Sequence, residues 1–350
     1  SSLSGSWHCG ASQNFLCTTD KTVTSLGKYF SSPGRIILSG ASEGSDAFAI
    51  AELLGEQPRQ NVLYIARDDV RMSMMAESLA FFMPTEKIIQ FPAWDCLPYD
   101  RISPKNEITS RRLRTLMDLI KYSQMGTRTV LLTTCNAALQ RVPTSGALEG
   151  CHFSLQVSKK IDIDALTKYL NCNGYHRSGT VMESGEYAVR GGIIDIYSSN
   201  SDNPVRIDLF GDVIESIRIF DPLTQRSSKY CEIVDLIPGS EVLLDEDSVT
   251  RFRGRYRKFF GAVTGEDSLY ESVSAYRRCP GIEHWLPLFH ESLTTVFEYL
   301  PDSIVFLDHL LEEATDERLN IINDFYSNGQ SMFVSTEPVA KESKPLQFHR

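Results

Sequence analysis

The stretch EYAVRGGIIDIYSSNSDNPVRIDLFGDVIESIRIF, residues 186–220, decides how the middle of the chain folds. Apolar and polar residues alternate along it, so Val205 and Ile207 point to one face of a strand. Arg206 and Asp208 then point to the other face. The links between its strand-like runs are short and rich in Gly, Asn, Asp and Ser. The stretch therefore predicts an antiparallel sheet with one packed and one solvated face.

The charged residues of these strands gather on the predicted solvated face. They are Arg190, Arg206, Arg218, Asp195 and Asp208. Their spacing alone favours cross-strand ion pairs in water, each contributing about 0.2–1 kcal/mol. The alternative is a charged docking surface, where truncation of a buried interfacial arginine costs about 2–5 kcal/mol.

Sequence on either side of this stretch predicts a different architecture. Residues 1–143 alternate short apolar runs (RIILSG, VLYIA, KIIQF and TVLLTT) with helical patterns. The helical patterns cover residues 45–55, 69–82 and 107–122, and the last carries the apolar stripe Leu113, Leu116, Met117 and Ile120. Such alternation predicts an α/β domain with a parallel sheet. Residues 144–222 then form a small inserted α+β domain whose helix stops near Gly174, and residues 223–350 are expected to pack back on the first section.

The segment LSGASEGSDAF, residues 38–48, lies where a nucleotide-binding protein keeps its phosphate loop. A working loop reads G-x-x-x-x-G-K-[ST]. Aligned on Gly40, the chain has Gly44 early and then Ser45, Asp46 and Ala47 in the last three positions. A carboxylate in the lysine position repels a triphosphate by roughly 4 kcal/mol for each contact at about 4 Å, at an effective dielectric constant of about 20. The segment is either a ruined phosphate loop or an ordinary strand-to-helix turn, and we expect no cofactor in either case.

Composition and charge exclude several other classes of function. The chain has 45 acidic and 35 basic residues, which disfavours DNA as its main partner. The run SVTRFRGRYRKFFG, residues 248–261, is better explained as an amphipathic helix that buries Phe252, Tyr256, Phe259 and Phe260, with its arginines in water. Eight cysteines without a CxxC pair predict reduced thiols in a cytoplasmic protein. The seven scattered histidines form no metal or catalytic set, and no apolar run predicts contact with a membrane.

Proline and aromatic residues mark a rigid crossing, FPAWDCLPYDRISP, residues 91–104. We expect Phe91 and Trp94 to fill the gap between sheet and helix. Three further residues offer a binding edge, Tyr99, Asp100 and Arg101.

Several collinear blocks resemble the bacterial transcription-repair coupling factor family and, through it, the excision-repair helicase UvrB. The blocks are FPAWDCLPYDRISPKNEITSRRL (91–113), GEYAVRGGIIDIY (185–197), PVRIDLFGD (204–212), IESIRIFDPLTQRS (214–227) and GIEHWLPLF (281–289). The resemblance covers nearly the whole chain. It implies a degenerate RecA-like domain, of the P-loop NTPase type, interrupted by the inserted α+β domain.

The resemblance also implies residue roles. The inserted domain of this family binds the damage-recognition ATPase UvrA, and the matching positions here are Arg177, Arg190, Arg206 and Asp208. Ala188 replaces an arginine that UvrB has two residues before its RGG sequence. UvrB has an intact phosphate loop, so the comparison implies that the segment around Asp46 is a ruined one.

The implied function is recruitment without catalysis. In the family, the full protein removes RNA polymerase stalled at a lesion by ATP-driven translocation on duplex DNA, and its UvrB-like part brings in UvrA. The regions for the motor, polymerase and DNA lie in later sequence, so we expect this chain to be a fragment. The family also implies that a C-terminal domain masks the UvrA-binding domain in the resting protein. The alternatives are an ATP-dependent helicase lobe and a DNA-binding module.

Overall fold

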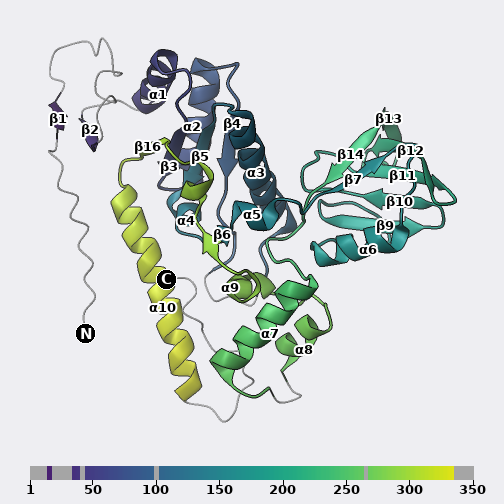
Figure 1. The fold of residues 1–350 in the computed structure, drawn as a ribbon. Helices are drawn as coiled ribbons and strands as arrows, with labels where there is room; N and C mark the ends of the chain where they lie inside the picture. The colour runs from purple at the N-terminus through teal and green to yellow at the C-terminus, as the bar shows by residue number, and fades with distance from the viewer. Residues whose placement is uncertain (1–13, 18–33, 40–43, 98–101, 264–266, 335–350) are drawn as a thin grey trace.

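The structure, a computed structural model, describes residues 14–17, 34–39, 44–97, 102–263 and 267–334. Figure 1 shows three parts: a sheet covered by helices, a second sheet beside it, and a group of helices below both. We call them the first, middle and helical parts.

A four-stranded parallel sheet forms the first part, in the order β16-β3-β5-β4. The strands are β16 (Ile304–Leu307), β3 (Val62–Ala66), β5 (Val130–Thr134) and β4 (Ile88–Phe91). Every side chain of β3 and β5 is buried, as both faces of the sheet are covered. β16 comes from the far end of the sequence, so the chain returns to the first part after leaving it.

Three helices cover the sheet, and their positions confirm the predicted periodicity. α1 (Ser45–Glu56) and α2 (Asp69–Phe82) pack on the face that contains Tyr64. α3 (Asn106–Met125) packs on the face that contains Leu63. The predicted stripe of α3 lies in this core, with Leu113, Leu116 and Ile120 buried and Met117 partly buried.

The strand before the segment that was compared with a phosphate loop does not lie where we expected it. β2 (Ile36–Ser39) pairs in parallel with β1 (Asn14–Cys17) in a separate two-stranded sheet. The expectation that the RIIL run joins the main parallel sheet is therefore wrong, and β16 occupies that edge of β3. A phosphate loop is built between a sheet strand and the following helix, so the RecA-like arrangement stays a prediction.

The middle part is a six-stranded sheet in the order β13-β12-β11-β10-β9-β8. Its strands are β8 (His176–Arg177), β9 (Glu186–Arg190), β10 (Ile193–Ile196), β11 (Val205–Phe210), β12 (Val213–Phe220) and β13 (Ser227–Cys231). Neighbouring strands are antiparallel except β8 and β9, which are parallel. The four strands predicted between residues 186 and 220 are thus present.

One helix and a small second sheet complete the middle part. α6 (Ile163–Cys172) covers one face of the six-stranded sheet with Leu166 and Leu170. β7 (Phe153–Gln156) pairs with β14 (Ile233–Leu236) and shares this core. β13 and β14 lie beyond residue 222, where we expected the inserted domain to end, so the middle part extends further along the chain.

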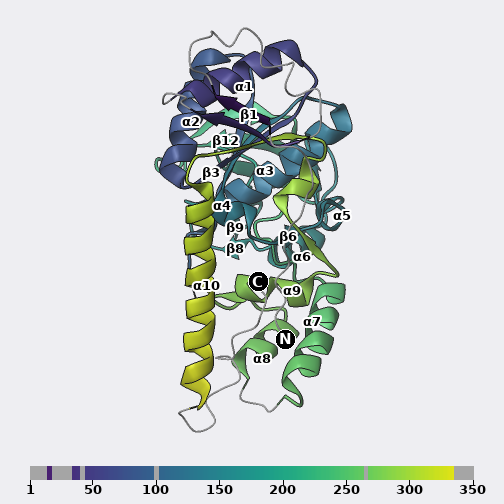
Figure 2. The same cartoon turned by 90° about the vertical axis from the view of Figure 1, so that its left-hand side faces the viewer.

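The helical part contains α7 (Glu246–Phe260), α8 (Ser268–Ser274) and α9 (Leu286–Phe289). Shorter elements around it are α4 (Cys135–Ala138), β6 (Val142–Pro143), α5 (Ser145–Leu148), η1 (Ile282–Trp285), β15 (Leu293–Thr294) and η2 (Val296–Tyr299). α10 (Leu311–Val334) runs from the first part alongside the helical part in both views (Figures 1 and 2).

α7 is the predicted amphipathic helix, with two differences on its surface. Phe252 and Tyr256 are fully buried as expected, but Phe259 is 57% exposed. The arginines do not all lie in water, because Arg255 donates to the main-chain carbonyl of Pro287 at 2.6 Å and Arg251 donates to another carbonyl of the same helix end. Carbonyls at the end of a helix lack partners within the helix, and these guanidinium groups supply them.

A buried ion pair joins the parts. The Arg112 guanidinium of α3 donates to the Glu241 carboxylate at 2.6 Å, and both side chains are fully buried. The Trp94 indole N–H also donates to Glu241, at 3.2 Å, and Arg112 stacks on the Phe91 ring with 4.3 Å to its centroid. Phe91 and Trp94 fill the interior as predicted, whereas the suggested binding edge at 99–101 lies outside the described residues.

Candidate protein-binding surface

The polar face of the middle sheet carries a row of residues in register across four strands. Ala188 of β9 lies opposite Asp195 of β10, which lies opposite Arg206 of β11, which lies opposite Arg218 of β12. Cross-strand partners share one face of a sheet, so the alternation that placed these residues together is confirmed.

Asp195 is the centre of this face and is fully buried. Its carboxylate accepts from Arg206 Nε at 2.7 Å and Nη2 at 2.9 Å, and from Arg190 Nη2 at 2.7 Å. Arg206 also lies over the Phe220 ring, 4.6 Å from its centroid. The expected solvated position of Asp195 is therefore wrong, because Val181, Ala188 and Phe220 form a small apolar cluster on this face.

A second ion pair lies beside the first. Asp208 accepts from Arg218 at 2.6 Å and from the Ser216 hydroxyl at 2.7 Å. Both charged side chains are partly covered. They hold neighbouring strands in register and leave little of Asp208 exposed to a partner.

The exposed part of this sheet combines a cation with apolar side chains. The Arg190 side chain is 50% exposed although one of its nitrogens is bonded to Asp195. Ile193 lies directly opposite Arg190 on β10 and is exposed. Phe210 and Tyr230 lie on β11 and β13 and are 79% and 76% exposed. Exposed aromatic residues and arginine on one sheet are typical of protein interfaces, and Ile193 is the exposed apolar residue directly beside Arg190.

Arg177 is separate from this group. It pairs with Tyr187, whose side chain packs in the core under α6, so Arg177 is not part of the polar row. It lines a groove of about 1,120 Å³ between the middle and helical parts, together with Lys168 and Arg277. The structure therefore brings together Arg190, Arg206 and Asp208 of the four predicted contacts, and places Arg177 at the edge of the sheet.

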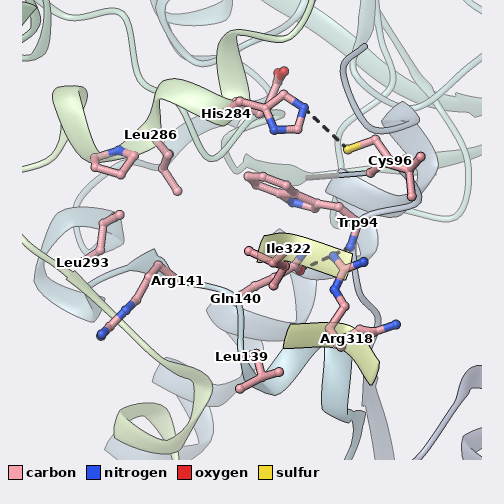
Figure 3. Close-up of a pocket in the computed structure, with 14 residues that line it drawn as sticks. Trp94, Cys96, Leu139, Gln140, Arg141, His284, Leu286, Leu293, Arg318 and Ile322 are labelled. Carbon is pink, nitrogen blue, oxygen red and sulfur yellow. Dashed lines mark hydrogen bonds between the residues drawn. The ribbon is translucent and has the colours of Figure 1, made fainter. Parts of the chain in front are cut away.

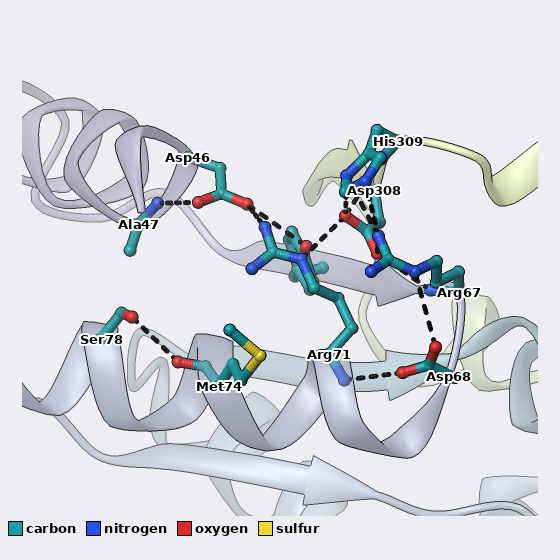
Figure 4. Close-up of polar contacts among 10 residues, drawn as sticks. Asp46, Ala47, Arg67, Asp68, Arg71, Met74, Ser78, Asp308 and His309 are labelled. Carbon is teal, nitrogen blue, oxygen red and sulfur yellow. Dashed lines mark hydrogen bonds and ion pairs between the residues drawn. The ribbon is translucent and has the colours of Figure 1, made fainter. Parts of the chain in front are cut away.

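An internal ion network lies at the start of α1, around Asp46 (Figure 4). Gly44 precedes α1 with φ of 86°, and Ser45 begins the helix. Arg71 of α2 pairs with Asp46, which stands in the lysine position, and Arg71 Nε donates to Asp308 at 3.1 Å. Asp46 also accepts from the N–H of Ala47 at 2.9 Å. Gly40 lies outside the described residues.

Asp308 holds this network together. Burial acts to raise the pKa of Asp308, but hydrogen bonds from the Arg67 amide and the Arg71 side chain lower it below its ordinary value. Arg71 and Asp308 were not found by the sequence analysis, because 237 positions separate them and no local pattern links them. The network satisfies the charge of Asp46 within the protein.

Two kinds of feature are absent from the described ranges. No group of three His, Cys, Asp or Glu side chains in those ranges is arranged to hold a metal ion. No helix in them has the length and apolar character needed to cross a membrane.

Comparison with known proteins identifies the family. The model described as the UvrB interaction domain matches residues 153–241. A transcription-repair-coupling factor from Haemophilus influenzae is 32% identical over 283 residues, covering 81% of this chain and 24% of the relative. The chain belongs to the transcription-repair-coupling factor family. The transcription-repair-coupling factor of Escherichia coli is 31% identical over 282 residues, covering 80% of this chain and 24% of the relative. That of Rickettsia typhi is 33% identical over 304 residues, covering 86% of this chain and 27% of the relative.

Within the transcription-repair-coupling factor family, this chain spans about a quarter of the length of the curated relatives that it matches. The matched interaction domain includes both sheets of the middle part, from β7 to β14. The surface around Arg190 therefore belongs to the part of the family chain that carries the UvrB interaction domain.

Proposed function

We propose that this chain is a recruitment module that binds UvrA through the polar face of its middle sheet and performs no catalysis. The observation that carries the proposal is the position of Arg190, which is half-exposed within the matched interaction domain and held in place by buried Asp195. A preorganised arginine beside exposed apolar side chains loses little conformational entropy on binding.

We propose distinct roles for the predicted contact residues. Arg190 contacts the partner directly, and Arg206 holds Asp195 so that Arg190 keeps its orientation. Asp208 serves mainly to fix the sheet through Arg218. Arg177 lies at the sheet edge and extends the contact towards the groove beside α6.

We infer from Asp46 that this chain performs no ATP-dependent catalysis. Its carboxylate repels a triphosphate and is already paired with Arg71. We infer that the segment does not hold ATP, so the geometry does not favour a helicase lobe. It does not favour a DNA-binding module either, because Arg251 and Arg255 of α7 bind carbonyls of the chain itself.

In the full-length protein we propose that further regions bind RNA polymerase and duplex DNA, and that a C-terminal domain masks the middle part. We also propose that the chain divides into a degenerate RecA-like domain and an inserted domain close to residues 153–241. The setting would be the cytoplasm.

The proposal is tested by measuring the affinity of purified UvrA for this chain with the substitution Arg190→Ala. We expect the affinity to fall by about 30-fold or more, since a truncated interfacial arginine costs about 2–5 kcal/mol and about 1.4 kcal/mol is tenfold. Arg257→Ala is the matched control, an exposed arginine on α7 that should leave affinity unchanged. Binding is measured by isothermal titration calorimetry, and thermal unfolding checks that each variant is folded. Wild-type affinity in a folded Arg190→Ala protein would remove the proposed contact.

A further inference from the structure

A small pocket lies where the first and helical parts meet (Figure 3). It encloses about 50 Å³, against roughly 10–15 Å³ for one water by the same measure. Its apolar wall is formed by Leu139, Leu286, Leu293 and Ile322, with Trp94 beside them. The pocket is therefore large enough for several non-hydrogen atoms of a ligand and offers them mostly hydrocarbon.

Arg318 of α10 is the unusual residue of this pocket. In the part of the chain that the structure describes, no carboxylate, hydroxyl or carbonyl accepts a hydrogen bond from its guanidinium. Every other buried or half-buried arginine in the same ranges has such an acceptor, as Arg112 has Glu241 and Arg278 has Ser240. Half-buried Arg318 is thus a cation that the fold leaves uncompensated.

The groups around Arg318 in the described ranges include no free carboxylate that pairs with it. Burial lowers the pKa of the Arg318 guanidinium. Glu283 also lines the pocket, but its carboxylate accepts from the Ser103 hydroxyl at 2.6 Å. A partly buried cation beside an apolar wall favours an anionic ligand, because the described residues supply no anion that pairs with it.

We propose that this pocket binds a small organic carboxylate whose anion pairs with Arg318 and whose hydrocarbon part packs against Trp94 and the leucine wall. A planar guanidinium matches a carboxylate through two parallel hydrogen bonds. The indole N–H of Trp94 is already bonded to Glu241, so the ring offers the ligand an apolar surface. This site lies on the first and helical parts and does not depend on the proposed UvrA contact.

Cys96 lines the same pocket and reports on its occupancy. It is partly exposed and is the single cysteine of the tryptic peptide covering residues 88–101. Its alkylation by iodoacetamide is followed by mass spectrometry at increasing isovalerate, a branched carboxylate of suitable size. Isovaleramide is the matched uncharged probe, and inorganic phosphate is the anion without hydrocarbon.

We expect isovalerate to slow alkylation of Cys96 at millimolar concentration, and isovaleramide and phosphate to be about tenfold weaker, a difference of about 1.4 kcal/mol. Arg318→Gln should abolish the preference for the carboxylate. Arg59→Gln, which changes an exposed arginine that does not line the pocket, should keep it. Arg318→Gln removes no hydrogen bond or ion pair among the described residues, so its melting temperature should stay within a few degrees of that of the wild type.

Three results with isovalerate would overturn the proposal. They are equal protection by isovalerate and isovaleramide, full protection in Arg318→Gln, and no protection at 100-fold above the expected range. Protection by phosphate equal to that by isovalerate would also overturn it, because the apolar wall would then have no role.

Discussion

Asp308 is the carboxylate on which the charged residues around Asp46 depend. It accepts from Arg71 Nε at 3.1 Å and from the Arg67 amide at 3.2 Å. Asp308→Asn keeps the shape but removes the charge, leaving Arg71 with Asp46 alone. We expect the free energy of unfolding to fall by about 1–3 kcal/mol at pH 7, as a charged hydrogen-bond acceptor is lost. Urea denaturation measures this loss.

The loss of stability caused by Asp308→Asn should depend on pH, in a direction set by the lowered native pKa of Asp308. A carboxyl with a lowered native pKa stabilises the fold above its unfolded pKa of about 3.9, and this stabilisation is lost as pH falls through the native pKa. The difference between wild type and Asp308→Asn should be constant between about pH 7 and 5 and shrink below about pH 4. Exposed Asp316→Asn should change stability by less than about 0.5 kcal/mol throughout. An Asp308→Asn difference that rises on acidification would contradict the assignment.

At the scale of single residues, the sequence predicted the direction of side chains but not their burial. Alternation along the strands correctly placed Asp195 and Arg206 on one face, because side-chain direction is a local property of a strand. It did not give the burial of Asp195, since Val181, which helps to cover that face, lies in a preceding segment outside the strands. Burial depends on tertiary contacts, which periodicity does not contain.

The end of α6 illustrates a constraint at the scale of an element. Gly174 follows the helix with φ of 89°, and a Cβ placed there would lie 2.4 Å from Ser240 Cβ. Gly174→Ala should therefore lower the free energy of unfolding by about 2–4 kcal/mol, combining backbone strain with overpacking. Gly150→Ala is the matched control, because φ is 83° there but no atom lies within 4 Å. Equal losses in the two variants, measured by urea denaturation, would show that the contact with Ser240 has no effect.

Elements were predictable where their period is strong. α1, α2, α3 and strands β9 to β12 lie where the apolar spacing placed them, because that spacing fixes which face each element buries. The identity of the strand with which each strand pairs could not be predicted in the same way. β2 has the expected composition, yet it pairs with β1, since strand pairing is chosen by the whole fold and not by the strand itself.

The whole molecule depends on contacts between parts that no local pattern reveals. Arg112 and Glu241 are 129 positions apart, and each reads in the sequence as an ordinary surface charge. In the structure they form a fully buried pair between α3 and the segment that follows the middle part. The strands and helices of residues 45–143 were visible as patterns, and residues 223–350 were expected to pack back on them. Neither strand β16 nor the Arg112–Glu241 connection was identified.

The contribution of this pair can be separated by a double-mutant cycle. Arg112→Met or Glu241→Leu alone leaves a buried charge without its partner, so each should cost about 3–5 kcal/mol. The double variant leaves neither charge and should cost clearly less than the sum, although the Trp94 indole N–H then lacks its acceptor. Urea denaturation gives the free energies, and hydrogen exchange in α3 and β14 shows whether both parts loosen together. If the two losses simply add, the charges act independently, and the parts are held by the packing of Phe91 and Trp94 instead.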